Sequence, residues 1–262
     1  MIGDSFVCLR SGSVAGAVFL IPGLGGNTEE LHAFATLLEP DISVYILQII
    51  GPNAIRHSRR IEAIADTCVT DILNIQPHGN YILAGYSFGG LVAFEAAKRL
   101  MSRGRTVRLL GLIECCPDEG LSARLIRRKL LGIAKTPIKK IPAKVSMTLK
   151  DFSFRLKVRF GVSVLEEARA GGLPERSIDN KIVNKVALQK YRPFKGPLDM
   201  IFFKATIRLG EFPPDPLRVW RPLVQRLTIE QVPGDHHTMI RAHAGSLATV
   251  FTRHLQVALA DY

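Results

Sequence analysis

Short apolar runs alternate with helix-like stretches along most of this chain, and that alternation restricts the fold more than any other feature. The runs read AVFLI at 17–21, VYILQI at 44–49, YILAGY at 81–86, VRLLGLI at 107–113, DMIFFK at 199–204 and LTIEQV at 227–232. Uniformly apolar strands are typical of parallel sheets, because helices cover both faces of such sheets. We therefore predict an α/β fold with a mostly parallel sheet flanked by helices.

The stretches between these runs have the spacing of helices. Residues 28–38 are expected to form a helix, with Asn27 and Glu30 as a capping box at its start. Ser58 is the expected cap of a second helix, whose apolar residues form one stripe: Ile61, Ile64, Ala65, Cys68, Val69 and Ile72. Residues 91–100 and 244–259 are expected to form two further helices.

The alternation breaks between about 117 and 185. We expect residues 1–262 to form a single domain, with this interruption as a lid inserted over the carboxyl edge of the sheet. Residues 152–162, FSFRLKVRFGV, alternate with a period of two, which favours a strand. Yet one helical face would also collect four apolar residues, so both structures remain open: Leu149, Phe152, Leu156 and Phe160.

The net charge of +12 is concentrated in the same interruption. Residues 121–160 contain one acid, Asp151, and twelve basic residues: Arg124, Arg127, Arg128, Lys129, Lys135, Lys139, Lys140, Lys144, Lys150, Arg155, Lys157 and Arg159. This stretch accounts for +11 of the net charge, which favours one acidic partner over general nucleic-acid binding. A solvated basic face and a membrane-surface segment, with Phe152, Phe154 and Phe160 among the charges, are the alternatives.

Nothing in the sequence indicates export or a membrane span. No apolar run approaches the roughly 18 residues that a membrane helix needs. The N-terminal MIGDSFVCLR lacks the charged-then-apolar order of a signal peptide. The four cysteines have no metal-binding spacing: Cys8, Cys68, Cys115 and Cys116. We therefore expect a cytoplasmic protein with reduced thiols and no bound metal.

The sequence GYSFGG at 85–90 places Ser87 between two close glycines. A predicted strand precedes it and a predicted helix follows, which is the context of a nucleophile elbow. Gly85 and Gly89 leave room for neighbouring backbone in such a sharp turn. The N–H of Phe88, at the start of the helix, would point at an oxyanion formed on Ser87. An ordinary strand-to-helix turn is the alternative interpretation.

A serine nucleophile needs a base. His236 and His237, in VPGDHHTMI, follow the last apolar run and therefore arrive at the same sheet edge as Ser87. The order of nucleophile, acid and histidine is that of an α/β-hydrolase. The loop PGLGG at 22–26 follows the first run and is expected to supply a second oxyanion donor. This loop lacks the glycine spacings of phosphate-binding loops.

These motifs together resemble a known family. FLIPGLGGN, GYSFGGLVAFEAAKRL, LIECCP and VPGDHHTM are similar to the thioesterase domains of polyketide and nonribosomal peptide synthetases, and to stand-alone type II thioesterases, within the α/β-hydrolase superfamily. The resemblance implies that Ser87 is the nucleophile and that His236, rather than His237, is the base. It also implies that the oxyanion donors are the backbone N–H groups of Phe88 and Leu24.

The acid is the point at which the sequence departs from this family. The family usually has Asp in a pattern like LLDxYPP after the strand that follows the nucleophile helix, whereas LIECCP here puts Glu114 in that place. A Glu carboxylate can still hold the histidine and stabilise its protonated form. Asp118, Glu211 and Asp215 are rival acids, and the last two follow the 199–204 run.

The resemblance implies a thioesterase that releases an acyl or peptidyl chain from the phosphopantetheine arm of a carrier protein. Release would pass through an acyl-serine and end in hydrolysis or cyclisation, with no bound cofactor and no metal. Carrier proteins of this kind are usually acidic, so residues 121–160 are a candidate docking surface. A general carboxylesterase or lipase on the same fold is one alternative, and a non-catalytic binding protein is another.

Overall fold

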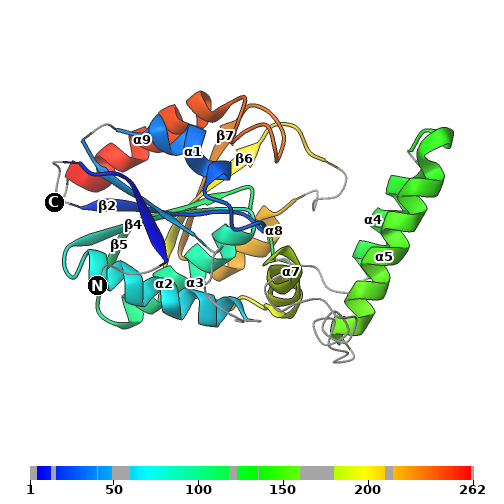
Figure 1. Ribbon diagram of the computed structural model, residues 1–262, viewed down its shortest axis with the longest axis horizontal. Helices are drawn as coiled ribbons and strands as arrows, with labels where there is room; N and C mark the ends of the chain where they lie inside the picture. The colour runs from blue at the N-terminus through cyan, green and yellow to red at the C-terminus, as the bar shows by residue number, and fades with distance from the viewer. Residues whose placement is uncertain are drawn as a thin grey trace.

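A seven-stranded sheet forms the centre of the protein (Figure 1). The computed structural model describes residues 5–12, 16–39, 41–48, 60–117, 123–134, 136–159, 180–209 and 215–260. The strand order is β1-β3-β2-β4-β5-β6-β7. Their bounds are β1 (Phe6–Arg10), β2 (Ala17–Ile21), β3 (Ser43–Leu47), β4 (Asn80–Tyr86), β5 (Thr106–Ile113), β6 (Asp199–Ala205) and β7 (Arg226–Val232). β1 is antiparallel to β3 and the other neighbouring strands are parallel, so the predicted sheet is confirmed.

Helices cover both faces of this sheet. α1 (Glu29–Thr36) and α9 (Ala244–Ala260) lie on one face, and α2 (Ile61–Ile75) and α3 (Phe88–Ser102) lie on the other (Figure 1). The apolar stripe expected on the second helix is buried along α2. Two short helical turns, α8 (Leu217–Trp220) and η3 (Arg221–Leu223), precede β7. The expected α/β-hydrolase architecture is therefore confirmed.

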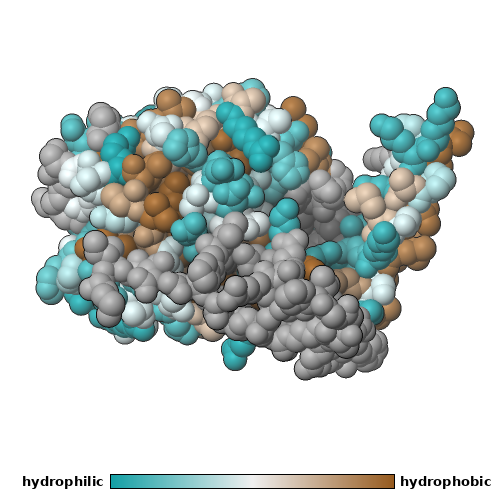
Figure 2. All heavy atoms as spheres, in the orientation of Figure 1, coloured by the Kyte–Doolittle hydropathy of each residue, from teal (hydrophilic) through white to brown (hydrophobic). Residues whose placement is uncertain are grey.

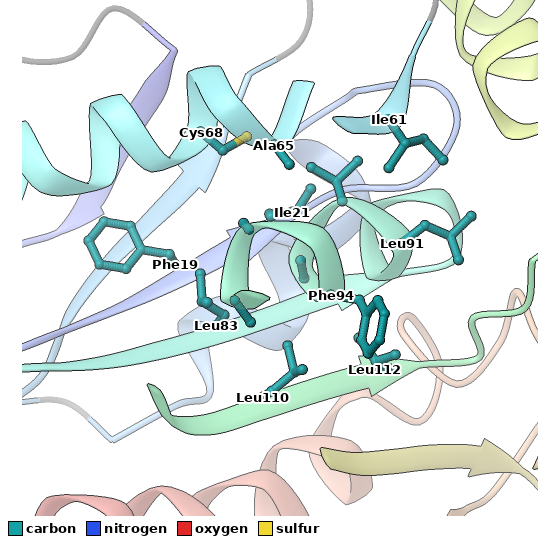
Figure 3. Close-up of a cluster of buried hydrophobic side chains, with 14 of the residues drawn as sticks. Phe19, Ile21, Ile61, Ala65, Cys68, Leu83, Leu91, Phe94, Leu110 and Leu112 are labelled. Carbon is teal, nitrogen blue, oxygen red and sulfur yellow. The ribbon is translucent and has the colours of Figure 1, made fainter. Parts of the chain in front are cut away.

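Each central strand contributes to two apolar layers because successive side chains point to opposite faces. On β2, Phe19 and Ile21 pack with α2 and α3, whereas Val18 and Leu20 pack with α1 and α9. Figure 3 shows the first layer, in which side chains from β2, β4 and β5 meet the buried sides of α2 and α3. Burial on both faces explains why these strands are uniformly apolar in sequence.

The described structure differs from the sequence-based expectations at three places. The edge strand β1 was not predicted, because its mixed exposure removes the apolar run that marks the other strands. Residues 152–159 are helical, so the strand interpretation is wrong there. Glu30 does not complete a capping box with Asn27, because its carboxylate instead accepts the N–H of Gly23 at 3.0 Å. The cap predicted at Ser58 lies outside the described residues.

The segment between β5 and β6 contains helices that stand beside the sheet. They are α4 (Ala123–Ala134), η1 (Ile138–Lys140), α5 (Ile141–Arg159) and α7 (Asn180–Lys190). α4 and α5 form an arm that projects from the body of the protein, and α7 lies between this arm and the sheet (Figure 1). Asp151 ties the three helices together through ion pairs with Lys129 of α4, Arg155 of α5 and Lys185 of α7.

α7 is also fastened to the body through the residue that follows it. The Tyr191 hydroxyl donates to Oε1 of Glu95 on α3 at 2.7 Å, and Lys98 binds the same oxygen at 2.7 Å. Glu95 is fully buried, so these bonds compensate a carboxylate that has no contact with water. The end of α7 is therefore fixed against α3. Among the residues that the structure describes, no helix is both long and apolar enough to cross a bilayer.

Gly89 provides a test of how closely α3 approaches β2. A Cβ at this position would lie 2.2 Å from the carbonyl oxygen of Ile21 and 2.3 Å from that of Pro22. We expect Gly89→Ala to lower the free energy of unfolding by about 3 kcal/mol or more, because backbone atoms cannot yield as side chains do. Urea denaturation of purified protein measures this change.

Gly245→Ala is the matched control, because Gly245 also lies in a helix, α9, and a Cβ there meets nothing within 4 Å. It should leave stability unchanged or raise it by up to about 1 kcal/mol. Equal effects of the two substitutions would contradict the close approach.

Candidate active site

The candidate site lies at the carboxyl ends of the parallel strands, where the chain reverses its direction of winding. β2 lies between β3 and β4, so the chain leaves β2 toward one edge and returns to its other side. In open α/β sheets, ligands bind in the crevice at such a switch point. Here the loop after β2 and the turn after β4 are adjacent, and Ser87 occupies that turn.

Ser87 has a strained backbone conformation between β4 and α3. Its φ is 53° and its ψ is −117°, values that non-glycine residues seldom adopt. The Ser87 N–H donates to the carbonyl of Ile113 at 2.9 Å, which ties the turn to the end of β5. A Cβ on Gly85 would lie 2.2 Å from the carbonyl oxygen of Gly89, so only glycine fits there. The geometry is that of a side chain held at the sheet edge by a sharp turn.

Two backbone donors lie beside this turn. Phe88 is the first residue of α3, where the helix has its partial positive charge. Leu24 lies in the loop after β2, in which the Gly26 N–H donates to the Gly23 carbonyl at 3.0 Å. Within the described ranges, neither the Phe88 N–H nor the Leu24 N–H has a hydrogen-bond acceptor. Both groups are therefore able to donate to a ligand.

His236 is brought to the same edge by the loop after β7. The Asp235 carboxylate accepts the backbone N–H groups of His237 at 2.9 Å and Thr238 at 2.8 Å, which forms a tight turn. The turn leaves His237 exposed and His236 only 5% exposed. The Tyr86 hydroxyl donates to the carbonyl of His236 at 2.8 Å, and the two rings are 5.0 Å apart. His236 thus packs directly against the residue that precedes Ser87.

The surroundings of His236 favour its neutral form. Burial is the largest cause, followed by the electrostatic influence of His237 and then of Arg208, and together they lower the pKa of His236 from 6.5 to about 3. Asp235 acts in the opposite direction but does not offset them. At neutral pH the ring is therefore uncharged and has a nitrogen able to accept a proton.

Glu114 follows β5 directly and is buried. Its φ of 43° is the other positive value among the described non-glycine residues. One carboxylate oxygen accepts the Ala205 N–H at 2.7 Å, and Arg208 binds the two oxygens at 2.7 and 2.6 Å. Burial raises the pKa of Glu114, although Arg208 and the Ala205 N–H act to lower it. Arg208 therefore favours the ionised form of a carboxyl group that burial alone would neutralise.

Arg208 was not among the residues predicted from the sequence. It lies three residues beyond the end of β6, and its charge acts on both Glu114 and His236. Arg208 thus links Glu114, which it binds, with His236, on which its charge acts. The only sequence signal was a basic residue near a strand end, which is too common to single out.

Of the three rival acids, the structure describes Asp215. Asp215 is exposed at the start of α8, where it accepts the Leu217 N–H at 3.1 Å and pairs with Arg218 at 3.3 Å. Asp118 and Glu211 lie outside the described residues. In the part of the chain that the structure describes, no three His, Cys, Asp or Glu side chains group together as metal ligands.

The depressed pKa of His236 predicts how stability depends on pH. The folded state binds the proton less tightly than the unfolded chain, so unfolding takes up a proton between about pH 6.5 and pH 3. Stability linked to His236 is therefore complete above pH 6.5 and is lost as the pH falls toward 3. Urea denaturation at a series of pH values should show a shallower acid loss for His236→Gln than for the wild type.

His237→Gln is the control, because it removes the neighbouring but exposed imidazole. It should keep most of the wild-type slope. A His236→Gln profile that is as steep as the wild-type profile would contradict the assignment of the slope to His236.

Comparisons with known proteins agree with this geometry. Residues 17–135 match the family model of the thioesterase domain. Vanchrobactin synthetase VabF of Vibrio anguillarum is 34% identical over 113 residues, which cover 43% of this chain and 4% of that protein. Enterobactin synthase component F of Escherichia coli K12 is 30% identical over 117 residues, which cover 44% of this chain and 9% of that protein. The chain thus spans less than a tenth of the length of either relative.

Similarity in structure extends further along the chain. The NocB thioesterase domain, solved as a covalent complex with a fluorophosphonate nocardicin G analog, superposes with a TM-score of 0.65. The match covers 95% of this chain and 99% of that domain at 21% sequence identity, which establishes the shared fold. Residues 17–135 carry the turn at Ser87 and the loop at Leu24, so the family match includes the centre of the candidate site. Residues 17–135 are therefore similar to the thioesterase domain family, and the chain as a whole has the fold of the solved thioesterase domain.

Proposed function

We propose that this protein is a serine thioesterase that releases an acyl or peptidyl chain from the phosphopantetheine arm of a carrier protein. The observation that carries the proposal is the strained turn at Ser87, which lies at the switch point of the sheet and within the family match. Relatives named as synthetases support a substrate held as a thioester during assembly. The four cysteines are free thiols, which supports a reducing, cytoplasmic setting.

The proposed reaction uses Ser87, His236 and Glu114. His236 accepts the proton of the Ser87 hydroxyl while Oγ attacks the thioester carbonyl carbon. The carbon–sulfur bond then breaks, and the leaving thiolate takes the proton from His236. Water attacks the resulting acyl-serine to release an acid, or a nucleophile within the chain attacks it to release a ring. Either route regenerates Ser87 and needs no metal.

Burial sets the electrostatic conditions for these steps. A neutral His236 is ready to accept a proton, but burial and Arg208 disfavour its charged form. Glu114 would stabilise the imidazolium as it forms, as the acid does in related triads. In this proposal Arg208 is a positioning residue: it keeps the Glu114 carboxylate ionised and held against Ala205, at the cost of some repulsion toward His236.

The oxyanion of the tetrahedral intermediate would be held by the N–H groups of Phe88 and Leu24. A preorganised donor of this kind is typically worth about 3–4 kcal/mol in the transition state. The partial positive charge at the start of α3 adds to this stabilisation at Phe88. The same arrangement supports a general carboxylesterase or lipase, so dependence on the carrier thioester must be measured.

The first test compares thiol release from an acyl thioester on a carrier protein with hydrolysis of a matched free oxygen ester. We expect strong preference for the carrier thioester. Ser87→Ala should reduce turnover to the uncatalysed level, because no other group would form the acyl-enzyme. Preference for the free ester would favour the esterase function.

A serine-reactive fluorophosphonate separates both enzymes from a non-catalytic binding protein. It should label Ser87 in the wild type and fail to label Ser87→Ala. Absence of labelling together with absence of turnover would refute the enzymatic proposal.

The arm formed by α4 and α5 is the proposed docking surface for the carrier, in the segment at about 117–185 that we infer to be a lid. Lys139 and Lys140 are exposed and lie between the two helices. Figure 2 shows polar and apolar side chains interleaved on this arm, and Ile138 is 85% exposed. A surface of this charge would attract an acidic carrier protein and direct the phosphopantetheine group of that carrier toward the sheet edge.

Removing positive charge from the α4–α5 arm should weaken docking of the carrier without changing the chemical steps. Replacing Lys139, Lys140 and Lys144 with Gln should raise KM for the carrier thioester at low salt, because the lost charges steer the encounter. Turnover of a small free thioester should stay at the wild-type level.

The control replaces three exposed arginines distant in sequence from the arm, Arg218, Arg221 and Arg226, with Gln. It should change neither value. Equal losses on the carrier and the small substrate would count against docking on the arm.

A further inference from the structure

Asn184 connects the inserted segment to the loop that carries Leu24. It lies on α7 and is only 2% exposed. Its side-chain amide donates to the carbonyl oxygen of Leu24 at 2.9 Å, across 160 residues of sequence. Lys181, one turn earlier on α7, lies beside Gly25 of the same loop. The contact therefore joins the first half of α7 to the loop after β2.

Three hydrogen bonds fix the orientation of the peptide groups around the Leu24 N–H. Glu30 accepts the N–H of Gly23 at 3.0 Å. The Gly23 carbonyl accepts the N–H of Gly26 at 3.0 Å. Asn184 holds the Leu24 carbonyl. Because a trans peptide is planar, a Gly23 carbonyl directed at Gly26 turns the Leu24 N–H the opposite way, out of the turn.

Of the residues that make these three hydrogen bonds, Asn184 is the one that lies outside the core of the domain. Gly23, Gly26 and Glu30 belong to the loop and to α1, whereas Asn184 comes from a helix in the segment inserted between β5 and β6. Burying an amide is unfavourable unless it makes hydrogen bonds, and this one has a partner only while α7 lies on the loop. The Tyr191 bond to Glu95 holds the other end of α7 in place.

We propose that Asn184 is a positioning residue that makes the oxyanion hole depend on the docking of α7. The Leu24 N–H has its donating orientation when Asn184 holds the adjoining carbonyl. Displacement of α7 removes that restraint and weakens the hole. The inference rests on the proposed function, because it takes the Leu24 N–H to be an oxyanion donor. It makes the inserted segment part of the catalytic assembly rather than only a cover.

Asn184→Leu is the decisive variant, because Leu keeps nearly the same volume and removes the donor. Asn184→Ala is a second variant in case Leu disturbs packing. The matched control is Gln189→Leu on the same helix, since the Gln189 side-chain amide is also buried but has no hydrogen-bond partner among the described residues. All proteins are assayed as full chains on the carrier thioester, with Ser87→Ala as the blank.

We expect Asn184→Leu to lower kcat by at least about 10-fold, and by less than the 10²- to 10³-fold loss of an entire donor. KM should change little, because the interaction strengthens only in the transition state. Affinity for an alkyl boronic acid, which forms a tetrahedral anion on the serine, should fall by a similar factor. Gln189→Leu should match the wild type in all three values.

Two results would overturn the inference. One is an Asn184→Leu enzyme whose kcat and boronic acid affinity equal those of Gln189→Leu. The other is a loss of kcat without any loss of boronic acid affinity, which would indicate a general structural defect.

Hydrogen exchange separates this inference from the proposed function. Amide exchange over residues 22–27 reports the Gly26 bond to Gly23 and needs no substrate. We expect faster exchange in Asn184→Leu than in Gln189→Leu, and equal exchange in the two would refute the coupling. A wild type without turnover or serine labelling would refute the enzymatic function, while the exchange result would still decide whether α7 restrains the loop.

Discussion

The strained backbone at Ser87 is the constraint on which the rest of the structure depends. A φ of 53° is unfavourable for a serine and persists only where its surroundings enforce it. Three glycines permit this, because a Cβ at Gly85, Gly89 or Gly90 would lie within 2.6 Å of neighbouring atoms. The hydrogen bond from Ser87 to Ile113 adds β5 to the support. The sheet and α3 thus determine where one hydroxyl is placed.

Burial is the main influence on the pKa values of the ionisable groups around this turn. Burial lowers the pKa of His236 and raises that of Glu114, so it disfavours charge on both. Arg208 opposes burial at Glu114 and reinforces it at His236. The charge of Arg208 thus favours an ionised Glu114 and a neutral His236.

The segment between β5 and β6 has two parts with different relations to the core. The α4–α5 arm projects from the body and is held to α7 through Asp151 (Figure 1). α7 packs on the core, with Tyr191 bound to Glu95 at one end and Asn184 bound to the loop after β2. An event on the arm therefore has a physical route to the candidate site through α7. The basic charge of the arm and the buried amide of α7 thus belong to one connected segment.

Local features of the sequence determined the strands, the main helices and the turn at Ser87, because they depend on periodicity and on glycine requirements within a few residues. The sequence order also put His236 and Glu114 at strand ends. Tertiary structure alone decided which groups these residues meet. Arg208 reaches Glu114 across 94 residues, and Asn184 reaches Leu24 across 160. Such contacts leave no periodic signal, because they arise from how strand ends and an inserted helix come together in space.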